Sequence, residues 1–491
     1  MSSQSAREAQ SGLDPWTVAE LPVPPTPKGL AWIGTVGPGV IVLGASIGSG
    51  EFLLGPAAFV RYGLTLLWVT LVAGFLQTVL NTELMRYTMA TGEPIFTGFM
   101  RTKPRAGFWA WIYTILYFLQ IGWPGWAGAA AGAIYFLVAK RLAGPAEAGI
   151  VYAIGVGTFL ACVLVLLIGR RIERTLEVLN WILVVSIIGG FLFLAILLVS
   201  PATWLAGLTG FFGFNPASGR FSFLPAGADF FLIGAFAAYS GAGGVINLTL
   251  SNWARDKGYG MSQLVGYIPA AVGGRRVPLA HTGITFTPTP EALSRWRGWW
   301  RIVRVDQWGI YFTGALLGMG LPALLYVAFV PAGSDIRGLG VAATLADALL
   351  DRAGGALLAG AVALLGAWIL FKTQLDVLEG MVRVITDMLW TGSRRLRAAP
   401  GVDVRVVYYG VLAVVVLWGI VALKLTQPIV LLQLGANMAG ITFIISSLHL
   451  LYVNTSLLPT ELRPPLWRRL ALVATALFYA TFVTLWLANL A

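Results

Sequence analysis

The sequence has few of the residues that build a soluble surface or a disulfide framework. Charged residues make up 11% of the 491 positions, whereas a soluble domain usually carries about a quarter. Cys162 is the single cysteine, so no internal disulfide can form. These shortages exclude a soluble enzyme, a disordered chain and a disulfide-stabilised secreted module.

Motifs of phosphate, acyl-transfer and zinc chemistry are also missing. The sequence contains no Walker loop, no hydrolase nucleophile elbow and no Cys/His set with zinc-binding spacing. No nucleophile is accompanied by a general base in a recognisable pattern. We therefore expect neither an enzyme nor a resident cofactor, and no ATP-driven transport by this chain alone.

Apolar sequence is what the chain has in abundance, at 57% of residues with a mean hydropathy of +0.79. A helix that spans a bilayer needs roughly 20 apolar residues, and backbone groups in lipid must be paired internally, which favours α-helices. We predict an all-α integral membrane protein with eleven transmembrane helices. They lie near residues 30–61, 63–89, 107–139, 148–168, 175–199, 227–254, 307–330, 356–390, 406–424, 427–452 and 468–490.

The net charge of +12 reflects topology. Most basic residues fall in segments that an internal N-terminus would place in the cytoplasm, as the positive-inside rule requires. Their clusters are Arg101/Lys103/Arg105, Arg170/Arg171/Arg174, Arg275/Arg276, Arg295/Arg297/Arg301/Arg304, Arg394/Arg395/Arg397 and Arg468/Arg469. We predict a multi-pass protein of the cell membrane, embedded in the lipid bilayer, with a cytoplasmic N-terminus and an external C-terminus. A nucleic-acid partner is not expected.

One basic cluster is interleaved with tryptophan, in the segment from Arg295 to Arg304. Tryptophan and arginine together favour the headgroup region of a bilayer. We interpret this part of the long loop 256–305 as an interfacial anchor, in preference to a docking site for a partner protein.

Two predicted helices are interrupted by glycines near mid-span. The first interruption runs from Gly44 to Glu51, and the second from Tyr239 to Gly244, followed by Asn247. Glycine costs about 1 kcal/mol per helix position, and such clusters are tolerated at membrane depth where the backbone faces protein or a water-filled cavity. Close helix packing is the alternative explanation.

The two interruptions are five helices apart, which predicts two inverted copies of a five-helix unit. The expected organisation is a cytoplasmic segment 1–29, repeat 1 at 30–199, an external loop 200–226, repeat 2 at 227–452 and an eleventh helix at 468–490. Unwound helices at matching positions of two such repeats indicate a binding site at the bilayer midplane.

Several segments together resemble one transporter family. They are Gly37-Pro38-Gly39-Val40-Ile41, Gly63 to Trp68 with Arg86 and Thr91-Gly92, Gly169 to Glu173, Asp306, and Glu379-Gly380. With these motifs the chain resembles the Nramp family of proton-coupled divalent-metal transporters, from Gly37 to about Asn454. The resemblance implies the leucine-transporter fold, with a 5+5 inverted repeat, an eleventh helix, and helices 1 and 6 broken.

The sequence departs from that family at the positions of its ion chemistry. The family's first-helix motif Asp-Pro-Gly-Asn corresponds here to residues 48–51, where only the glycine matches. Its Met-Pro-His motif corresponds to residues 238–240, and the acidic residues of its third helix are absent from Trp123-Pro124-Gly125-Trp126. The resemblance therefore implies the scaffold, and the ion chemistry has to be argued from the residues present.

Residues around the two breaks form the candidate substrate site: Gly48, Ser49, Gly50, Glu51, Ala238, Tyr239, Ser240, Gly241, Asn247 and, from the tenth helix, Gln433. A carboxylate at the midplane is expensive and needs a cation, a proton or a basic partner. Glu51 is therefore a candidate metal ligand or proton carrier, with a helix-capping role as the alternative. Oxygen ligands favour hard ions such as Mn²⁺ or Mg²⁺.

A charged stripe in the predicted eighth helix is the second constellation. Its members, Lys372, Asp376, Glu379, Arg383 and Asp387, lie on one helix face, and ion pairs four residues apart are available along it. Together with Glu51, the first three are candidates for a coupling or proton path. Lys372 could replace a coupling cation or carry a proton, and a structural ion-pair ladder is the alternative.

Two isolated polar residues complete the set of predictions. Asp229 opens the sixth helix, where a carboxylate complements the helix dipole. His449 lies near the cytoplasmic end of the tenth helix, where a hydrogen bond between helices is favoured over a proton relay.

The leading hypothesis is a secondary active symporter that moves a divalent metal cation by alternating access, with a proton or sodium as the coupling ion. A transporter of a small organic or amino-acid-like solute on the same fold is the alternative. A non-transporting membrane sensor is the second alternative.

Overall fold

The computed structural model describes residues 11–167, 172–268, 279–334, 336, 338–352, 354–425 and 427–489. The predicted basic pairs Arg170/Arg171 and Arg275/Arg276, and the start of the Gly169–Glu173 motif, lie outside the described residues. Within the described ranges, ten helices are long and apolar enough to cross a membrane. They are Pro38–Tyr62, Leu64–Thr91, Ala106–Ala139, Pro145–Leu167, Ile172–Leu198, Pro290–Phe329, Gly355–Gly392, Val404–Ala422, Pro428–Ser456 and Leu466–Ala488.

The helix predicted at 227–254 is present as two shorter helices, α12 (Phe230–Ala238) and α13 (Val245–Lys257). Neither reaches the length of a span because the predicted break falls between them. The first span is divided in the same way, into α3 (Pro38–Ser46), the π-helical turn η1 (Gly50–Leu54) and α4 (Gly55–Tyr62). Both glycine interruptions therefore appear as breaks in the structure.

A further interruption lies in the third span. The single helix predicted at 107–139 is two helices, α7 (Ala106–Ile121) and α8 (Gly125–Ala139). The connection includes Pro124, which has no backbone N–H to continue the helix. The remaining spans are formed by α5 (Leu67–Thr91), α9 (Ala148–Leu167), α10 (Ile172–Leu198), α15 (Thr313–Phe329), α17 (Gly355–Gly392), α19 (Val404–Ala422), α20 (Pro428–Ser456) and α21 (Leu466–Ala488).

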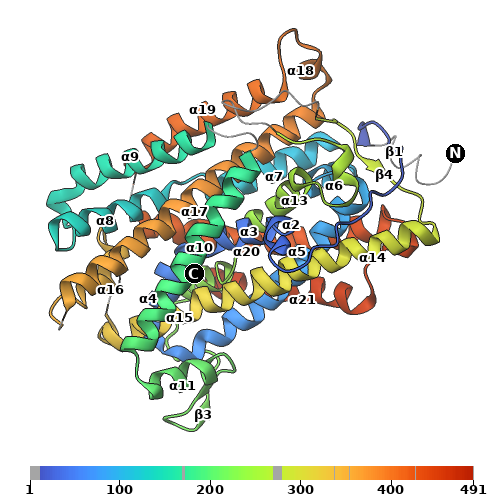
Figure 1. Cartoon of the computed structure of the whole chain (residues 1–491). Helices are drawn as coiled ribbons and strands as arrows, with labels where there is room; N and C mark the ends of the chain where they lie inside the picture. The colour runs from blue at the N-terminus through green and yellow to red at the C-terminus, as the bar shows by residue number, and fades with distance from the viewer. Residues whose placement is uncertain are drawn as a thin grey trace.

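The prediction that 256–305 is a loop throughout was wrong at its end. The seventh span begins as α14 (Pro290–Arg304), which continues through η5 (Val305–Phe312) into α15 as one long rod (Figure 1). The hydroxyl of Thr289 caps its N-terminus and Pro290 occupies the first turn, two features that start helices. Hydropathy did not reveal this segment because α14 is amphipathic and rich in arginine.

The core of the bundle is made by the broken helices together with α5 and α17, whereas α9, α10 and α19 lie at the periphery. Figure 1 shows α17 running beside α8, α9 and α19, and α17 contacts each of these helices. Peripheral helices expose large apolar side chains such as Leu164, Val185 and Leu417, each about 60% or more exposed. Such outward apolar faces are what a lipid-embedded protein requires.

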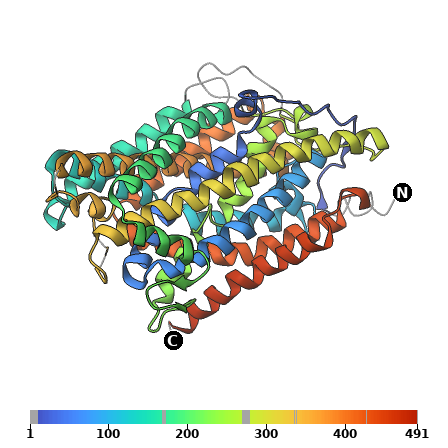
Figure 2. The same cartoon turned by 60° about the horizontal axis from the view of Figure 1, so that its bottom comes forward.

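Short elements cover the two ends of the bundle. At one end are α2 (Ala31–Thr35), α6 (Ile95–Met100), α18 (Arg394–Ala398) and the parallel pair of β1 (Thr17–Val18) with β4 (Ile284–Thr285). At the other are α11 (Pro201–Gly210), α16 (Thr344–Asp347) and the antiparallel pair of β2 (Phe214–Asn215) with β3 (Arg220–Phe221) (Figures 1 and 2).

The N-terminal segment ties several basic clusters together at the first of these ends. The Asp14 carboxylate accepts hydrogen bonds from Arg394 at 2.5 Å and lies 3.0 Å from His281, and Arg101 donates to the Asp14 carbonyl at 3.0 Å. Arg295 donates to the Leu21 carbonyl at 2.8 Å. Clusters far apart in the sequence therefore lie on the same side of the bundle.

The Trp/Arg segment of α14 packs against the chain's own N-terminal segment and neighbouring arginines. The Trp299 indole donates to the Pro22 carbonyl at 2.9 Å. The guanidinium groups of Arg86 and Arg468 lie 4.3 and 5.0 Å from the centre of the Trp300 ring. Part of the predicted interfacial anchor is thus occupied by contacts within the chain.

Candidate functional site

The first break is a change of backbone direction at Ile47. This residue has ψ of 82°, far from helical, and its N–H still bonds to Leu43 of the preceding turn. Two glycines allow close approaches on the far side of the break. A Cβ on Gly48 would lie 2.7 Å from the Thr373 hydroxyl of α17, and one on Gly50 would collide with the backbone carbonyl of Tyr239.

Glu51 turns its carboxylate back into this break. Its side chain is buried, with 1% of its surface exposed. One carboxylate oxygen accepts from the Ser46 hydroxyl at 3.1 Å and the other from the Gly48 N–H at 3.0 Å. Both hydrogen bonds hold the carboxylate against the residues of the first break.

The second break depends on glycine for its backbone conformation. Gly241, Gly243 and Gly244 have φ of 134°, 78° and 50°, values that residues with a side chain rarely adopt. The glycines that predicted a break in the sequence are thus the residues whose backbone forms it.

Side chains from three other helices satisfy the exposed backbone of the second break. Gln120 of α7 donates to the Gly243 carbonyl at 2.7 Å and accepts from the Val245 N–H at 3.0 Å. The Tyr311 hydroxyl accepts from the Ala242 N–H at 3.1 Å and donates to Gln77 of α5 at 2.9 Å. The break is therefore held open by a built polar frame.

The two breaks face each other across a small cavity of about 10 Å³. That is room for about one water-sized group. The Trp126 indole of α8 lies on its wall and donates to the Ser49 hydroxyl at 3.1 Å. The cavity is lined by Ala45, Ser46, Ser49, Gly50, Ile121, Trp126, Tyr239, Gly241, Ala242, Ile246 and Val377.

The predicted substrate residues are only partly brought together. Ser49, Gly50, Tyr239 and Gly241 line this cavity, with Gly48 and Glu51 directly behind it in the first break. The hydroxyl of Ser240 is directed to the carbonyl of Phe236 in its own helix, at 2.9 Å, and Ala238 is the buried last residue of α12.

Asn247 belongs to a polar chain behind the second break. Its amide donates to Asn81 at 2.8 Å, Asn81 donates to Gln307 at 3.0 Å, and Gln307 donates to Asp306 at 2.8 Å. The same Asp306 carboxylate accepts from the Gly37 N–H at 3.0 Å. This buried chain of hydrogen bonds links α13, α5 and η5 to the residue that precedes α3.

Gln433 lies elsewhere, in a second cavity of about 280 Å³. Its walls come from α4, the start of α12, the start of α20 and the segment near Gly333. Arg61 and Asp229 also line it and form an ion pair at 3.4 Å. Asp229 caps α12 as predicted, by accepting from Phe231 and Leu232. Helix rotation, which a linear sequence does not reveal, placed Gln433 here and away from the break.

The charged stripe of α17 is divided between two environments. Lys372 donates from Nζ to the Ile47 carbonyl at 3.2 Å, and the Thr373 hydroxyl donates to the same oxygen at 3.2 Å. Asp376 accepts from Asn180 of α10 at 2.9 Å through one oxygen. This half of the stripe therefore contacts the first break.

The other half of the stripe is an ion-pair network with the end of α13. Glu379 pairs with Arg383 at 2.5 Å, as its spacing indicated, and accepts from the Trp253 indole at 2.9 Å. The available pair between Arg383 and Asp387 is replaced by partners from α13, since Arg383 pairs with Asp256 and Asp387 with Arg255. The geometry at Glu379 is thus that of the structural alternative.

His449 is held as a hydrogen-bonding residue between helices. Its Nδ1 lies 3.0 Å from the Tyr113 hydroxyl and its Nε2 lies 2.9 Å from the Thr102 hydroxyl. The ring stacks on Phe99 with centroids 4.2 Å apart.

Sequence reasoning missed the side chains that frame the breaks, namely Ser46, Gln77, Gln120, Trp126 and Tyr311. A signal was available for two of them, because Gln77 and Gln120 are amides inside apolar spans, where polar residues mark functional or structural sites.

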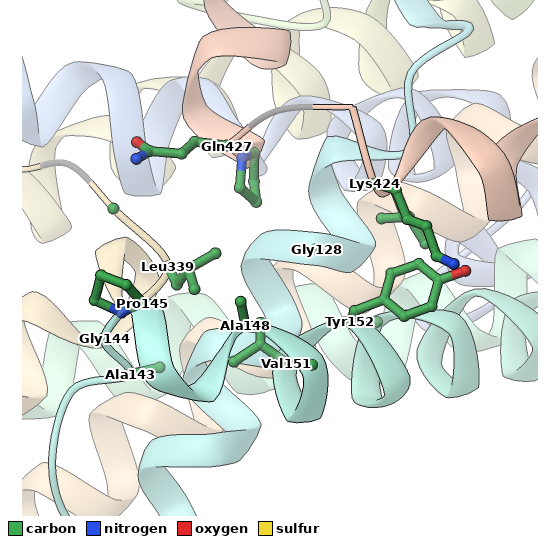
Figure 3. A pocket seen from close by; sticks show the side chains of 15 residues that line it. Gly128, Ala143, Gly144, Pro145, Ala148, Val151, Tyr152, Leu339, Lys424 and Gln427 are labelled. Carbon is green, nitrogen blue, oxygen red and sulfur yellow. The ribbon is translucent and has the colours of Figure 1, made fainter.

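A wider cavity, of about 680 Å³, lies away from both breaks (Figure 3). It is bounded by α8, α9 and the ends of α19 and α20, and its lining is mostly apolar. The Lys424 ammonium lies 4.8 Å from the centre of the Tyr152 ring on its wall. Among the residues that the structure describes, no group of three His, Cys, Asp or Glu side chains could hold a metal ion.

Comparison with known proteins agrees with this architecture, although no family model matches the chain. A stretch of 184 residues, 37% of the chain, is 28% identical to the divalent metal cation transporter MntH of Chromohalobacter salexigens. The chain spans 40% of the length of that relative.

Solved structures extend the similarity over nearly the whole chain. A mutant of the Eremococcus coleocola manganese transporter superposes with a TM-score of 0.63 at 17% identity, covering 93% of this chain and 87% of that one. The same transporter in complex with an aromatic bis-isothiourea substituted compound gives 0.62, covering 97% and 92%. The chain therefore shares its fold with these transporters, and part of its sequence is similar to a divalent metal cation transporter. It has the leucine-transporter fold predicted from the sequence, with helices 1 and 6 broken, and it is a multi-pass membrane protein.

Proposed function

We propose that this protein is a secondary active transporter of the Nramp class, which moves a divalent metal cation across the cell membrane by alternating access. The observation that carries the proposal is the meeting of two broken helices at a small polar cavity deep in the bundle, with the Glu51 carboxylate in the first break. Broken helices of this kind form the substrate sites of secondary transporters. The similarity to a divalent metal cation transporter supports the same substrate class.

The chemistry of the cavity indicates how a metal ion would be bound. Glu51, directly behind the cavity, would supply a carboxylate, and Ser46 and Ser49 on the cavity wall would supply hydroxyls. These are hard oxygen ligands, which favour Mn²⁺ or Mg²⁺ over softer ions. Since the carboxylate now accepts from Ser46 and Gly48, metal binding requires Glu51 to exchange those hydrogen bonds for the ion.

The coupling path in this proposal runs from Glu51 to Lys372 and Asp376. All three side chains are buried, and Lys372 donates to the Ile47 carbonyl of the break that also holds Glu51. A charged residue inside a spanning helix usually serves ion or proton movement. We assign Glu379 to the structural network with Arg383, and not to this path.

The orientation in the membrane follows from the basic clusters. Arg101, Arg295 and Arg394 all contact the N-terminal segment at one end of the bundle. We propose that this end is cytoplasmic, in accordance with the positive-inside rule.

Flux measurements in liposomes test the proposal. The purified protein should carry Mn²⁺, Mg²⁺ or Ca²⁺ down an imposed gradient, and Glu51→Gln should abolish that flux. Glu461→Gln, at an exposed position, is the matched control and should transport normally. Absence of flux for all three ions in the unmodified protein would contradict the proposal.

A small organic solute is the second candidate substrate. The specific observation in its favour is that the cavity wall includes the large apolar and aromatic side chains of Ile121, Trp126 and Tyr239, and no carboxylate. Thermal stabilisation of the protein by amino acids, and not by divalent metals, would favour this alternative.

A further inference from the structure

Where helix 1 breaks, one backbone carbonyl is released from its helix. In a continuous α-helix the carbonyl of Ile47 would accept from the N–H four residues later. Here two side chains of α17 donate to it, the Lys372 ammonium at 3.2 Å and the Thr373 hydroxyl at 3.2 Å. Residues 325 positions apart in the chain are thereby joined at the break.

A carboxylate of the same helix lies close in the chain to these two donors. Asp376 lies one helical turn beyond Lys372, and one of its carboxylate oxygens is buried without a hydrogen-bond partner. Its other oxygen accepts from Asn180 of α10. The Lys372 ammonium therefore lies on a stretch of α17 with Asp376, and its carbonyl partner Ile47 lies four residues before Glu51.

A freed carbonyl, a hydroxyl and a nearby carboxylate are a ligand set that suits a small monovalent cation. Unwound backbone carbonyls coordinate such ions in secondary transporters. Lysine is costly at this depth, since its side chain is completely buried. The presence of lysine at this buried position is explained if the positive charge of its ammonium is needed there.

We propose that Lys372 is a tethered cation. Its ammonium occupies the position between the first break and α17 at which these oxygens would otherwise hold an alkali ion. The protein therefore needs no sodium or potassium to close the break. The inference concerns the folded state itself, and it rests on the proposed function only where it also predicts sodium-independent transport.

The thermal stability of the purified full-length protein tests the proposal without knowledge of the substrate. Replacing choline chloride by sodium or potassium chloride at constant ionic strength should leave the melting temperature of the unmodified protein unchanged. Lys372→Ala should melt at a lower temperature, because it leaves the oxygens at this position without a cation. Sodium or ethylammonium should raise its melting temperature saturably, by about 2 °C or more.

Two further variants distinguish charge from packing. Lys372→Met fills the same space without a charge, and it should be destabilised without rescue by ethylammonium. Thr373→Val removes the other donor to Ile47 while keeping Lys372, and its stability should stay insensitive to sodium. A saturable stabilisation of the unmodified protein by sodium would overturn the proposal, as would equal behaviour of Lys372→Ala in choline, sodium and ethylammonium.

If Lys372→Ala does not fold, the sodium titration of the unmodified protein and the Lys372→Met variant still decide. Sodium-independent stability together with absence of metal flux would leave Lys372 as the tethered cation and refute the proposed function. The two ideas can thus fail separately.

Discussion

Replacing Gly50 by alanine is a direct test of whether the two broken helices touch. A Cβ at this position would collide with the Tyr239 carbonyl oxygen, and it would lie 2.8 Å from the carbonyl carbon and 3.0 Å from the Tyr239 Cβ. Two of these atoms belong to the backbone of the second break, which is held by hydrogen bonds from other helices. The clash therefore cannot be relieved by rotating a side chain.

The magnitude follows from two opposing effects. Alanine gains about 1 kcal/mol over glycine in a helix, whereas overpacking a well-packed site costs about 1–3 kcal/mol. Because the obstacle is backbone, we expect the upper part of that range and a net loss of stability. On the proposed function, the separated breaks should also slow metal flux.

The assay is the melting temperature of the purified protein, compared with a matched glycine that has free space. Gly189 lies within α10, and no atom lies within 4 Å of the position its Cβ would take. Gly189→Ala should leave the melting temperature unchanged or raise it. If Gly50→Ala were as stable as Gly189→Ala and transported normally, the contact between the breaks would not exist as described.

Two further predictions concern charged pairs outside the spans' central region. Arg61 and Asp229 are 45% and 29% exposed, so Arg61→Gln should change stability by no more than about 1 kcal/mol. When combined with Gln433→Cys, Arg61→Gln should nevertheless speed the reaction of that cysteine with a charged thiol reagent, relative to Gln433→Cys alone. An unchanged labelling rate would show that the Arg61–Asp229 pair does not close this cavity. Burial alone would raise the pKa of Glu93, but the Arg101 guanidinium outweighs it and holds the pKa below its ordinary value. The pair therefore stabilises the protein at neutral pH and loses that contribution as the pH falls. Glu93→Gln should have a lower melting temperature than the unmodified protein at pH 7, and its melting temperature should fall less as the pH is lowered. Parallel plots of melting temperature against pH for the two proteins would contradict this.

Local sequence features were sufficient for most of the helical scaffold. The span predicted at 148–168 is α9, and the two glycine clusters are both breaks. Each follows from properties of single residues, because the cost of exposing a polar group to lipid and the cost of glycine in a helix depend little on distant neighbours. Segment α14 escaped prediction because it is amphipathic and rich in arginine, and because its partners at residues 20–22 are distant in the sequence.

Which side chains meet at the site was decided only by the tertiary structure. Periodicity placed Lys372 on a charged face of its helix, but it could not say that this face meets the carbonyl of Ile47. Gln433 shows the converse, since a residue in the predicted helix points into another cavity. The reason is physical: side-chain contacts depend on how far each helix is rotated and where it crosses its neighbours. Many side chains packing at once settle that geometry, so it cannot be read from one stretch of sequence.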